Sequence, residues 1–242
     1  MCSSDLIADP LEFDRTLTSA AALASQKPSI VTLGIAPDFA ATGYGYIQEG
    51  QKAGDFLGHQ AFKVSRFTEK PDREKAEEFI KLGNYTWNSG MFIFTAQTLL
   101  DQMKIHAPEI MQPLEAHGIE AYPTLPKQSV DYALMEKTDL AYVLPVSFGW
   151  DDLGDWNAIE RLLKGDEAHN PNVELAQHIG LDTAGAILYS SSSDDVIVTI
   201  GLDNVVVVRD GNVTLVVDKS RTQEIKGVLN KIKENAAWEH LL

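Results

Sequence analysis

The sequence predicts an α/β domain followed by a small β-rich region that ends in a helix. From about residue 10 to residue 165, helix patterns alternate with short apolar runs typical of strands, which indicates an α/β sheet. From about residue 170, strand patterns follow one another with few helices between them. The 242 residues suffice for one large domain and a small appendage. We expect residues 1–168 and 169–242 to form these two parts.

The elements of the first domain follow from residues at their ends. Asp9 as N-cap, with Pro10 and Glu12 after it, predicts a helix from Pro10 to Ser25. Gly83 ends a second helix that begins at Pro71 and Asp72. Further helices are expected after Thr95, from Ser129 and after Asp155, the last with Trp156, Ile159, Leu162 and Leu163 on its inner face. Strands are expected at 29–33 (ended by Gly34), after Tyr46, and at 62–67, 91–94 and 142–146.

The second region is predicted to contain four short strands and a final helix. The strands are expected at 186–190, 196–200, 205–209 and 213–217. Asp210-Gly211 is typical of a type I′ hairpin turn. Ser220, with Gln223 three residues later, predicts the start of the last helix, whose apolar stripe is Ile225, Val228, Leu229 and Ile232. We expect this region to act as a packing surface or as the surface through which a homo-oligomer forms.

Composition limits the function classes. The net charge of −15 argues against nucleic acid as a partner, because phosphate backbones are bound by clustered Lys and Arg. A phosphorylated small molecule stays possible, since one or two local cations and a metal can meet its charge. The single cysteine, Cys2, argues against a disulfide framework and fits a reducing compartment. No apolar run reaches the ~18–20 residues of a membrane span, so we expect no membrane partner and a cytoplasmic protein.

Five short patches mix glycine, aromatic and charged residues in a way that core packing does not explain. They are TGYGY at 42–46, FTEKP at 67–71, NSGMF at 88–92, DYALME at 131–136 and WDDLGDW at 150–156. In this order they resemble the sugar-phosphate half of the sugar nucleotidyltransferases, and most closely the bacterial mannose-1-phosphate guanylyltransferases. The resemblance runs from about Ile7 to the last helix. It implies a Rossmann-like nucleotidyltransferase domain with a mixed sheet, here incomplete.

Asp152 is the candidate metal ligand. It follows a predicted strand at a glycine-bounded turn, where active groups of α/β sheets gather. Mg²⁺ prefers carboxylate oxygen and usually takes one or two protein carboxylates. On the residues alone, Asp151, Asp152 and Asp155 serve equally well as turn and helix-cap oxygens, and we accept the cap role for Asp155. The resemblance implies a catalytic Mg²⁺ on Asp152.

Glu69 and Lys70 place a carboxylate and an ammonium group at the end of a strand that Pro71 stops. On the residues alone, a solvated turn pair is the better interpretation. The resemblance implies that Glu69 contacts sugar hydroxyls and that Lys70 binds the sugar phosphate and takes part in catalysis. Because neighbouring strand residues point to opposite faces, both reach one ligand only if the chain bends there.

Two glycine-containing patches supply the other substrate-binding candidates. These are Gly43, Tyr44, Gly45, Asn88, Ser89 and Gly90. An Asn amide both donates and accepts, which suits a sugar hydroxyl, and glycines allow a ligand to approach the backbone closely. A self-stabilised loop at 88–90 and a plain hairpin turn at 43–45 remain alternatives. The resemblance implies that both patches line the sugar pocket.

Asp131 and Glu136 form a weaker candidate pair. Residues five apart lie about 140° apart round an α-helix, so we do not expect them to act as an acid–base couple. Asp131 near a helix N-terminus is explained by the helix dipole. We interpret this patch as serving recognition rather than catalysis. The six histidines show no metal-ligand spacing.

The resemblance also defines a function and a missing part. In the family, a glycine-rich loop with an arginine cradles the nucleotide, and this sequence has no such loop. Cys2-Ser3-Ser4-Asp5-Leu6 is what the end of a common sequencing adapter would encode in frame, so we expect an N-terminally truncated frame. The parent enzyme is expected to convert mannose 1-phosphate and GTP to GDP-mannose and pyrophosphate, with this chain inactive alone. The alternatives are a hexose-1-phosphate nucleotidyltransferase that uses UTP or dTTP, and a non-catalytic sugar-phosphate-binding or assembly fragment.

Overall fold

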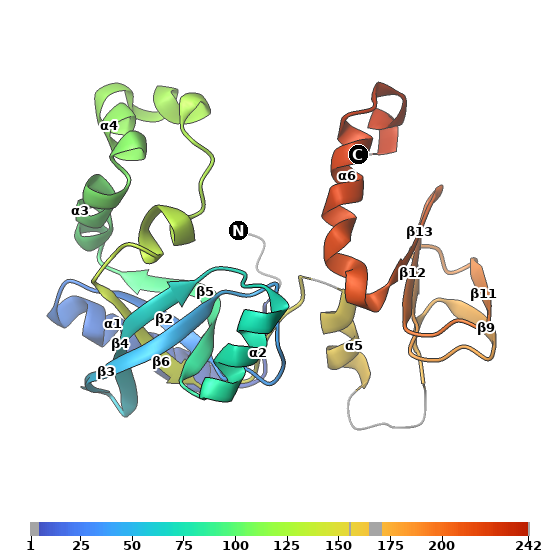
Figure 1. Ribbon diagram of the computed structural model, residues 1–242, viewed down its shortest axis with the longest axis horizontal. Helices are drawn as coiled ribbons and strands as arrows, with labels where there is room; N and C mark the ends of the chain where they lie inside the picture. The colour runs from blue at the N-terminus through green and yellow to red at the C-terminus, as the bar shows by residue number, and fades with distance from the viewer. Residues whose placement is uncertain (1–4, 155, 165–170, 242) are drawn as a thin grey trace. The chain divides into compact units, whose positions relative to one another are not determined.

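The computed structural model describes residues 5–154, 156–164 and 171–241 (Figure 1). The chain divides into two compact units. We call Ile7–Trp150 the sheet unit, and the described part of 151–242, with residues 5 and 6, the C-terminal unit. This division precedes α5 (Trp156–Lys164), whereas the boundary at 168/169 was placed after it and stays a prediction. The expected cap Asp155 lies outside the described residues.

A mixed five-stranded sheet forms the centre of the sheet unit, which confirms the predicted α/β class. Its strands are β2 (Ile30–Ile35), β3 (Tyr46–Phe56), β4 (His59–Thr68), β5 (Tyr85–Phe94) and β6 (Ala141–Val146). The spatial order is β2-β5-β3-β4-β6, and β6 also pairs with β2, so the sheet closes on itself. Only the β2–β6 pair is parallel.

Helices begin where their cap residues predict. The Asp9 carboxylate accepts the backbone N–H groups of Leu11 and Glu12 at 3.1 and 3.0 Å. Gly83, in the left-handed region with φ 70°, ends the second helix as expected. The helices of this unit are α1 (Pro10–Gln26), α2 (Arg73–Leu82), α3 (Ala96–His106) and α4 (Pro108–His117), with a 3₁₀ helix at Gly118–Thr124 and a π-helix at Asp131–Met135.

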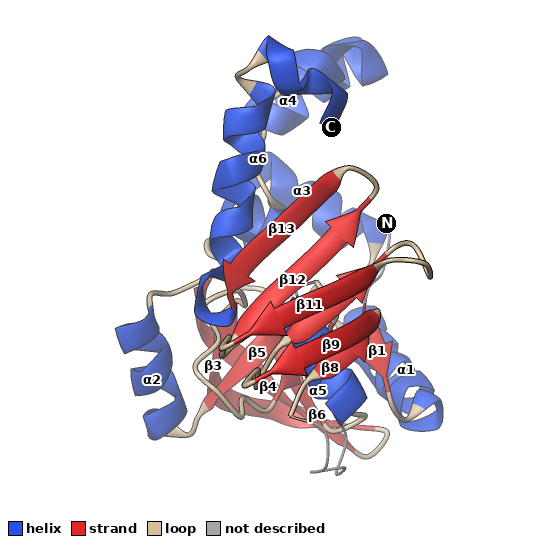
Figure 2. Cartoon of the chain, turned by 90° about the vertical axis from the view of Figure 1, so that its right-hand side faces the viewer, coloured by secondary structure: helices blue, strands red, loops and turns tan. Residues whose placement is uncertain are grey.

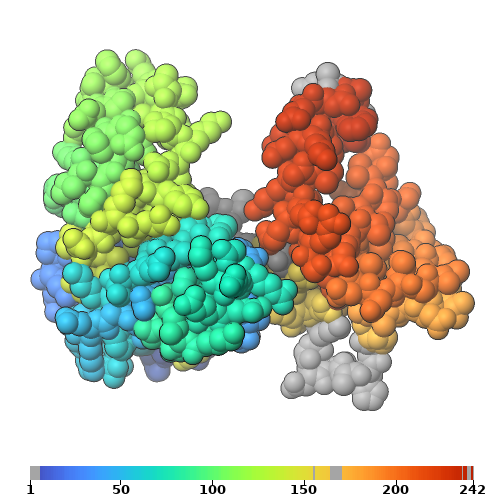
Figure 3. Space-filling model, viewed as in Figure 1, coloured from blue at the N-terminus to red at the C-terminus, as the bar shows by residue number. Residues whose placement is uncertain are grey.

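The two faces of the sheet are covered by different helices. Leu23 of α1 and Phe79 of α2 pack in one core cluster with the strands. Leu134 and Met135 of the π-helix, with Leu99 of α3, pack on the other face. Figure 1 shows α3 and α4 rising from the sheet before the chain returns to it through residues 131–135. In the space-filling view, α3 and α4 form a separate lobe of the unit (Figure 3). The π-helix is therefore the element that holds residues 131–136 against the sheet.

Strands β2 and β5 run through residues that the sequence predicts to lie outside them. Gly34 does not end β2; a Cβ there would lie 2.4 Å from Thr86 Oγ1, so the glycine allows close packing inside the strand. Strand β5 begins at Tyr85 rather than at 91, because the Asn88 backbone N–H donates to Gly45 O at 2.8 Å. The 88–90 patch is therefore part of a strand and not a loop.

The C-terminal unit is built from two small sheets (Figure 2). Its strands are β8 (Val173–Leu175), β9 (Gln177–Leu181), β10 (Ile187–Ser190), β11 (Val196–Ile200), β12 (Val205–Asp210) and β13 (Val213–Asp218). β8, β10 and β12 are parallel, β12–β13 is an antiparallel hairpin, and β9 pairs with β11 separately. The four predicted strands are confirmed. A short pair of β1 (Asp5–Ile7) and β7 (Trp150–Asp152) lies where the chain passes between units.

Three local predictions for this unit are wrong. The hairpin turn is Gly211-Asn212, and only Gly211 has positive φ, whereas a type I′ turn needs both. Asp218, not Ser220, is the cap: it accepts the Ser220 N–H at 2.8 Å and starts a 3₁₀ helix. Half of the expected inner face of α5, Leu162 and Leu163, is exposed.

The chain closes with three short helical segments. After the 3₁₀ helix Lys219–Glu224 come α6 (Ile225–Lys233) and a 3₁₀ helix at Ala236–Leu241. The apolar stripe predicted for α6 is present, but Val228 and Leu229 are exposed. Within the described residues, no helix has the length and apolar character needed to cross a membrane.

Candidate functional site

Polar side chains from four separate stretches of the sheet unit meet at one end of the sheet. We call this group the polar cup: Thr32, Glu69, Lys70, Asn88 and Asp131. The β2–β5 register sets Gly34 opposite Asn88, close to where β2 and β6 end. The π-helix packs on this face of the sheet and brings Asp131 to Asn88, so strand ends and the π-helix together position the cup.

The orientation of the Asn88 amide is fixed by its partners. Its Oδ1 accepts hydrogen bonds from Thr32 Oγ1 at 2.9 Å and from the Gly90 backbone N–H at 3.2 Å. A backbone N–H can only donate, so the oxygen and not the nitrogen must face Gly90. The Nδ2 group then points to Asp131 Oδ1, at 3.5 Å. Asn88 therefore offers the cup a hydrogen-bond donor.

Glu69 and Lys70 meet because the chain bends between them. Lys70 has φ +46°, in the left-handed region that non-glycine residues rarely adopt and that clusters at functional sites. The Lys70 ammonium forms an ion pair with the Glu69 carboxylate. The Glu69 side chain is 8% exposed and that of Lys70 54%. The Glu69 side chain is thus held inside the cup, while the Lys70 cation stays at its rim. The bend at Lys70 therefore allows both side chains to reach one ligand.

Gly45 forms part of the cup wall. A Cβ at this position would lie 2.7 Å from Glu69 Oε2 and 3.3 Å from Asn88 Cβ. The start of β3 therefore reaches these two side chains only because residue 45 has no side chain.

Asp131 and Glu136 are closer in angle than the sequence predicts. The Glu136 N–H donates to Asp131 O at 3.0 Å, an i to i+5 bond that makes this turn a π-helix. The expected separation of about 140° assumes an α-helix and is wrong here, since a π-turn brings residues five apart to the same side. Glu136 Oε1 accepts the backbone N–H of Glu69 at 3.4 Å. Periodicity gave no signal for this extra residue in the turn.

The environment of Asp131 makes ionisation costly. Burial raises the pKa of its carboxyl above the usual value, and the neighbouring Glu69 charge raises it further. Hydrogen bonds from its own backbone N–H and from Ser129, and the Lys70 charge, act in the opposite direction. The helix-dipole interpretation missed this residue: Asp131 belongs to the cup.

Other predicted substrate-binding residues lie elsewhere. The Tyr44 ring packs against Trp87 and Trp150, at centroid distances of 5.1 and 5.4 Å, in the cluster on the opposite sheet face. Ser89 is buried, and its Oγ accepts the Met91 N–H at 3.3 Å. Gly43 lies half-buried in the turn before β3. Sugar-binding roles for these three residues stay predictions.

Asp152 lies in β7 and belongs to the C-terminal unit. Its neighbour Asp151 binds Arg161 through two hydrogen bonds of 2.7 and 2.8 Å, which identifies Asp151 as a structural carboxylate. Gly154 packs on the Asp152 carboxylate, where a Cβ would lie 2.9 Å from Oδ1. That Asp152 joins the polar cup around one ligand stays a prediction.

The Asp152 carboxylate is the kind of oxygen ligand that Mg²⁺ takes from proteins. Across the described ranges, no three His, Cys, Asp or Glu side chains are grouped to bind a metal. One carboxylate from Asp152, with phosphate and water oxygens completing the shell, is a common arrangement for Mg²⁺. The residues present therefore fit the metal that the resemblance implies.

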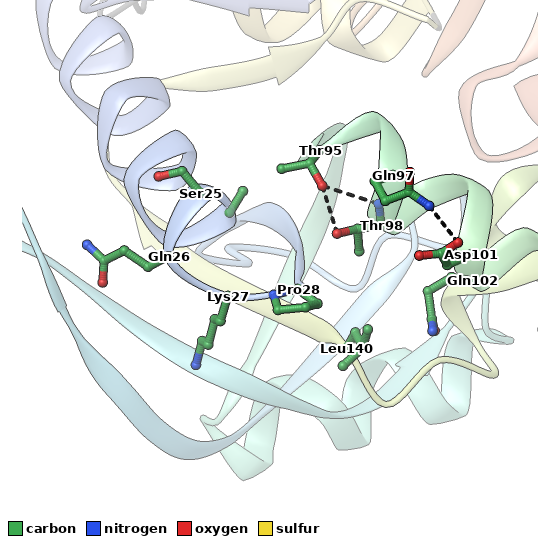
Figure 4. A pocket seen from close by; sticks show the side chains of 11 residues that line it. Ser25, Gln26, Lys27, Pro28, Thr95, Gln97, Thr98, Asp101, Gln102 and Leu140 are labelled. Carbon is green, nitrogen blue, oxygen red and sulfur yellow. Dashed lines mark hydrogen bonds between the residues drawn. The ribbon is translucent and has the colours of Figure 1, made fainter.

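A pocket of about 410 Å³ lies at the other end of the sheet (Figure 4). The end of α1, the start of α3 and Leu140 line it. Some of its polar groups bond to one another: Thr95 Oγ1 pairs with Thr98 Oγ1, and Gln97 donates to Asp101, both at 2.8 Å. None of the predicted site residues lines this pocket.

Comparison with known proteins assigns the chain to a family. A family model described as nucleotidyl transferase matches residues 1–169. The chain belongs to the nucleotidyl transferase family. A second model, described as a MannoseP isomerase/GMP-like beta-helix domain, matches residues 176–232 of this nucleotidyl transferase, in the region of the two small sheets.

Named relatives agree with the resemblance seen in the sequence. This nucleotidyl transferase is 35% identical to mannose-1-phosphate guanylyltransferase ManC of Salmonella typhimurium over 87% of its own length and 46% of the relative's. It is 33% identical to the Escherichia coli K12 mannose-1-phosphate guanylyltransferase, over 99% of its own length and 52% of the relative's. The chain therefore spans about half the length of the curated relatives it matches.

A solved structure agrees with the fold as well. The mannose-1-phosphate geranyltransferase of Thermus thermophilus superimposes with a TM-score of 0.79 at 31% identity, covering 95% of this nucleotidyl transferase and 68% of that chain. The resemblance to the mannose-1-phosphate guanylyltransferases is thereby confirmed.

Proposed function

We propose that this nucleotidyl transferase is a mannose-1-phosphate guanylyltransferase, which transfers GMP from GTP to mannose 1-phosphate. The supporting observation is the polar cup, where Glu69, Lys70 and Asn88 meet although they lie on β5 and the turn between β4 and α2. Its composition suits a phosphorylated sugar. Buried acceptors and an amide donor can bind hydroxyl groups, and the single exposed cation of the cup can bind a phosphate.

The reaction needs positioning more than covalent chemistry. A phosphate oxygen of mannose 1-phosphate attacks the α-phosphorus of GTP, the bond from that phosphorus to the bridging β-phosphate oxygen breaks, and pyrophosphate leaves with the electron pair. Lys70 would neutralise the attacking phosphate, while Glu69 and Asn88 hold the sugar in line. Mg²⁺ on Asp152 would supply positive charge to the phosphate oxygens.

Two other functions fit parts of the same site. A hexose-1-phosphate nucleotidyltransferase that uses UTP or dTTP would need a similar cup, and the names of the relatives favour the guanylyl enzyme. A non-catalytic sugar-phosphate-binding fragment would bind the sugar phosphate alone. We also propose that the protein acts in the cytoplasm and assembles into homo-oligomers through the sheets of its C-terminal unit.

Calorimetry on the full chain tests the proposal. We expect mannose 1-phosphate to bind more tightly than glucose 1-phosphate, and unphosphorylated mannose to bind much more weakly because Lys70 would have no anion. GTP with Mg²⁺ is titrated separately, since a catalytic chain must bind both substrates. Binding of mannose 1-phosphate without GTP favours the non-catalytic alternative. Absence of any sugar-phosphate binding by the folded chain, with folding checked by circular dichroism, overturns the proposed site.

A further inference from the structure

Asp131 is a charged member of the polar cup to which the proposed function gives no specific contact. It begins the π-helix that covers this face of the sheet, and its Oδ1 lies 3.5 Å from Asn88 Nδ2. π-turns are frequent at functional sites, and the extra residue changes the direction of the side chains in the turn. Here the re-aimed side chain reaches Asn88 on β5.

The hydrogen-bond inventory of Asn88 leaves one group over. Both lone pairs of its Oδ1 are used by Thr32 and Gly90. Its Nδ2 carries two hydrogens, and within the described part of the chain Asp131 is the one acceptor in reach. One N–H is therefore available to a ligand, next to a carboxylate that can accept.

The surroundings indicate that this donor and this acceptor face a polar ligand. Thr86 lies two residues before Asn88, and thus on the same face of β5. It is 5% exposed, and among the described residues its Oγ1 has no hydrogen-bond partner. Buried polar atoms are rarely left without partners, and exceptions point to functional sites or to bound molecules. Glu69, whose side chain is buried too, adds a second acceptor.

A hydroxyl group matches the Asn88–Asp131 pair. It carries one donor and two acceptor lone pairs, so it can donate to the carboxylate and accept from the amide at once. A phosphate group offers only acceptors at neutral pH, and two carboxylates repel it. The phosphate of a sugar phosphate would therefore lie toward Lys70 at the rim, with a hydroxyl toward Asp131.

We infer that Asp131 is a specificity-determining residue, which binds one hydroxyl group of the sugar as an acceptor and holds the Asn88 amide in its donating orientation. This inference rests on the proposed function, because it assumes that the cup binds a hexose phosphate.

The first experiment compares the chain with Asp131→Asn by titrating mannose 1-phosphate between pH 5 and pH 8. The amide can still turn its oxygen to Asn88, so the orientation of Asn88 is kept while the anionic acceptor is lost. We expect binding about tenfold weaker at pH 8, the difference between a charged and a neutral hydrogen bond. Because burial raises the pKa of Asp131, the ratio of the two affinities should move toward one as the pH falls.

Two controls isolate Asp131. The phosphate of the ligand also titrates, near pH 6, but it does so equally with every variant and cancels in the affinity ratio. Asp139→Asn makes the same chemical change at an exposed carboxylate just before β6. Its affinity for mannose 1-phosphate should equal that of the unmutated chain at every pH. An equal, pH-independent affinity for the chain and Asp131→Asn would overturn the inference.

The second experiment starts from the unmutated chain. Mannose 1-phosphate analogues, each lacking one hydroxyl, are titrated with it. One analogue should lose about tenfold in affinity at pH 8 and should bind the chain and Asp131→Asn alike. Equal losses for all analogues would overturn the inference while leaving the proposed function intact. Failure of the unmutated chain to bind mannose 1-phosphate at all would overturn both.

Discussion

The sheet unit contains two polar clusters that look alike in composition and differ in how fully they are satisfied. The polar cup is one. The other, which we call the histidine cluster, consists of Glu12, Thr16, Ser19 and His59. His59 at the start of β4 bonds through Nε2 to Glu12 Oε1 and through Nδ1 to Ser19 Oγ, both at 2.9 Å. It thereby ties helix α1 to the sheet.

A carboxylate, a histidine and a hydroxyl in a row have the composition of a hydrolase triad. Ser19 is fully buried, however, and its Oγ also donates to Arg15 O at 2.9 Å, so no substrate carbonyl can reach it. Both ring nitrogens of His59 have partners, and the network closes on itself. In the polar cup one Asn88 amide hydrogen is left over, and the hydroxyl of Thr86, on the same face of β5, has no partner among the described residues. The Lys70 backbone is strained as well. Unsatisfied groups, rather than residue types, distinguish the binding cluster from the structural one.

The largest expected effect is on binding at the cup. Lys70→Met removes the ammonium group that we assign to the phosphate. We expect mannose 1-phosphate to bind roughly a hundredfold more weakly, the scale of a lost charge-assisted hydrogen bond. Calorimetry measures the change.

Two further variants make this test specific. Lys70→Met leaves the buried Glu69 carboxylate without its ion pair, so the double variant with Glu69→Gln should restore neutrality and still bind weakly. Lys81→Met, on exposed α2, should bind as the unmutated chain does. If Lys81→Met weakened binding as much as Lys70→Met, overall charge and not the cup would control affinity.

The histidine cluster should respond in the opposite way. His59→Ala leaves Glu12 and Ser19 without their partner inside the unit. We expect the free energy of unfolding to fall by about 2–3 kcal/mol, the cost of the lost hydrogen bonds and of removing a largely buried ring. Urea unfolding followed by tryptophan fluorescence measures it. His117→Ala, at an exposed position, should change stability by less than about 0.5 kcal/mol.

Affinity completes the contrast between the clusters. At a temperature where His59→Ala is folded, its affinity for mannose 1-phosphate should equal that of the unmutated chain. A clear loss of affinity would place His59 in the binding machinery and end the distinction drawn between the two clusters.

Local signals explain why most helices were predictable. Asp9 and Thr95 act on backbone groups within three residues, and Gly83 acts through its own φ angle. Such signals are complete in the sequence. Strand β5 depends instead on a distant partner, since Asn88 pairs with Gly45, and its polar residues imitate a loop.

The candidate site was predictable only in part for the same reason. Glu69, Lys70 and Asn88 followed from the family resemblance, and the structure brings them together. A position near a helix N-terminus explains Asp131 by the helix dipole alone, and the sequence shows no sign of the π-turn that brings its side chain to Asn88. The packing of Tyr44 against Trp87 was not predictable either, because an aromatic ring beside two glycines gives no sign of which sheet face it will join. The positions of these side chains depend on tertiary packing, which no single stretch of sequence encodes.

Two glycines test whether the cup wall acts through contact or through backbone strain. Gly45→Ala places a methyl group 2.7 Å from Glu69 Oε2, so we expect roughly tenfold weaker binding of mannose 1-phosphate as Glu69 is displaced. Gly83→Ala strains the left-handed end of α2 but has nothing within 4 Å of its Cβ. It should lower the free energy of unfolding by about 1 kcal/mol and leave affinity unchanged. Equal affinities for the two variants would show that the close approach at Gly45 does not shape the site.

The smallest expected effect concerns the cost of keeping Asp131 ionised. Burial and the Glu69 charge raise its pKa in the folded chain, so the folded state binds protons more tightly than the unfolded state. Above the raised pKa the ionised group therefore destabilises the fold, and this penalty disappears as the pH falls through that pKa. Asp131→Asn should accordingly be slightly more stable than the unmutated chain at pH 7, with the difference shrinking toward pH 4 in urea unfolding series. A variant less stable at pH 7 would mean that Asp131 serves the fold, as His59 does, and would move it from the binding cluster to the structural one.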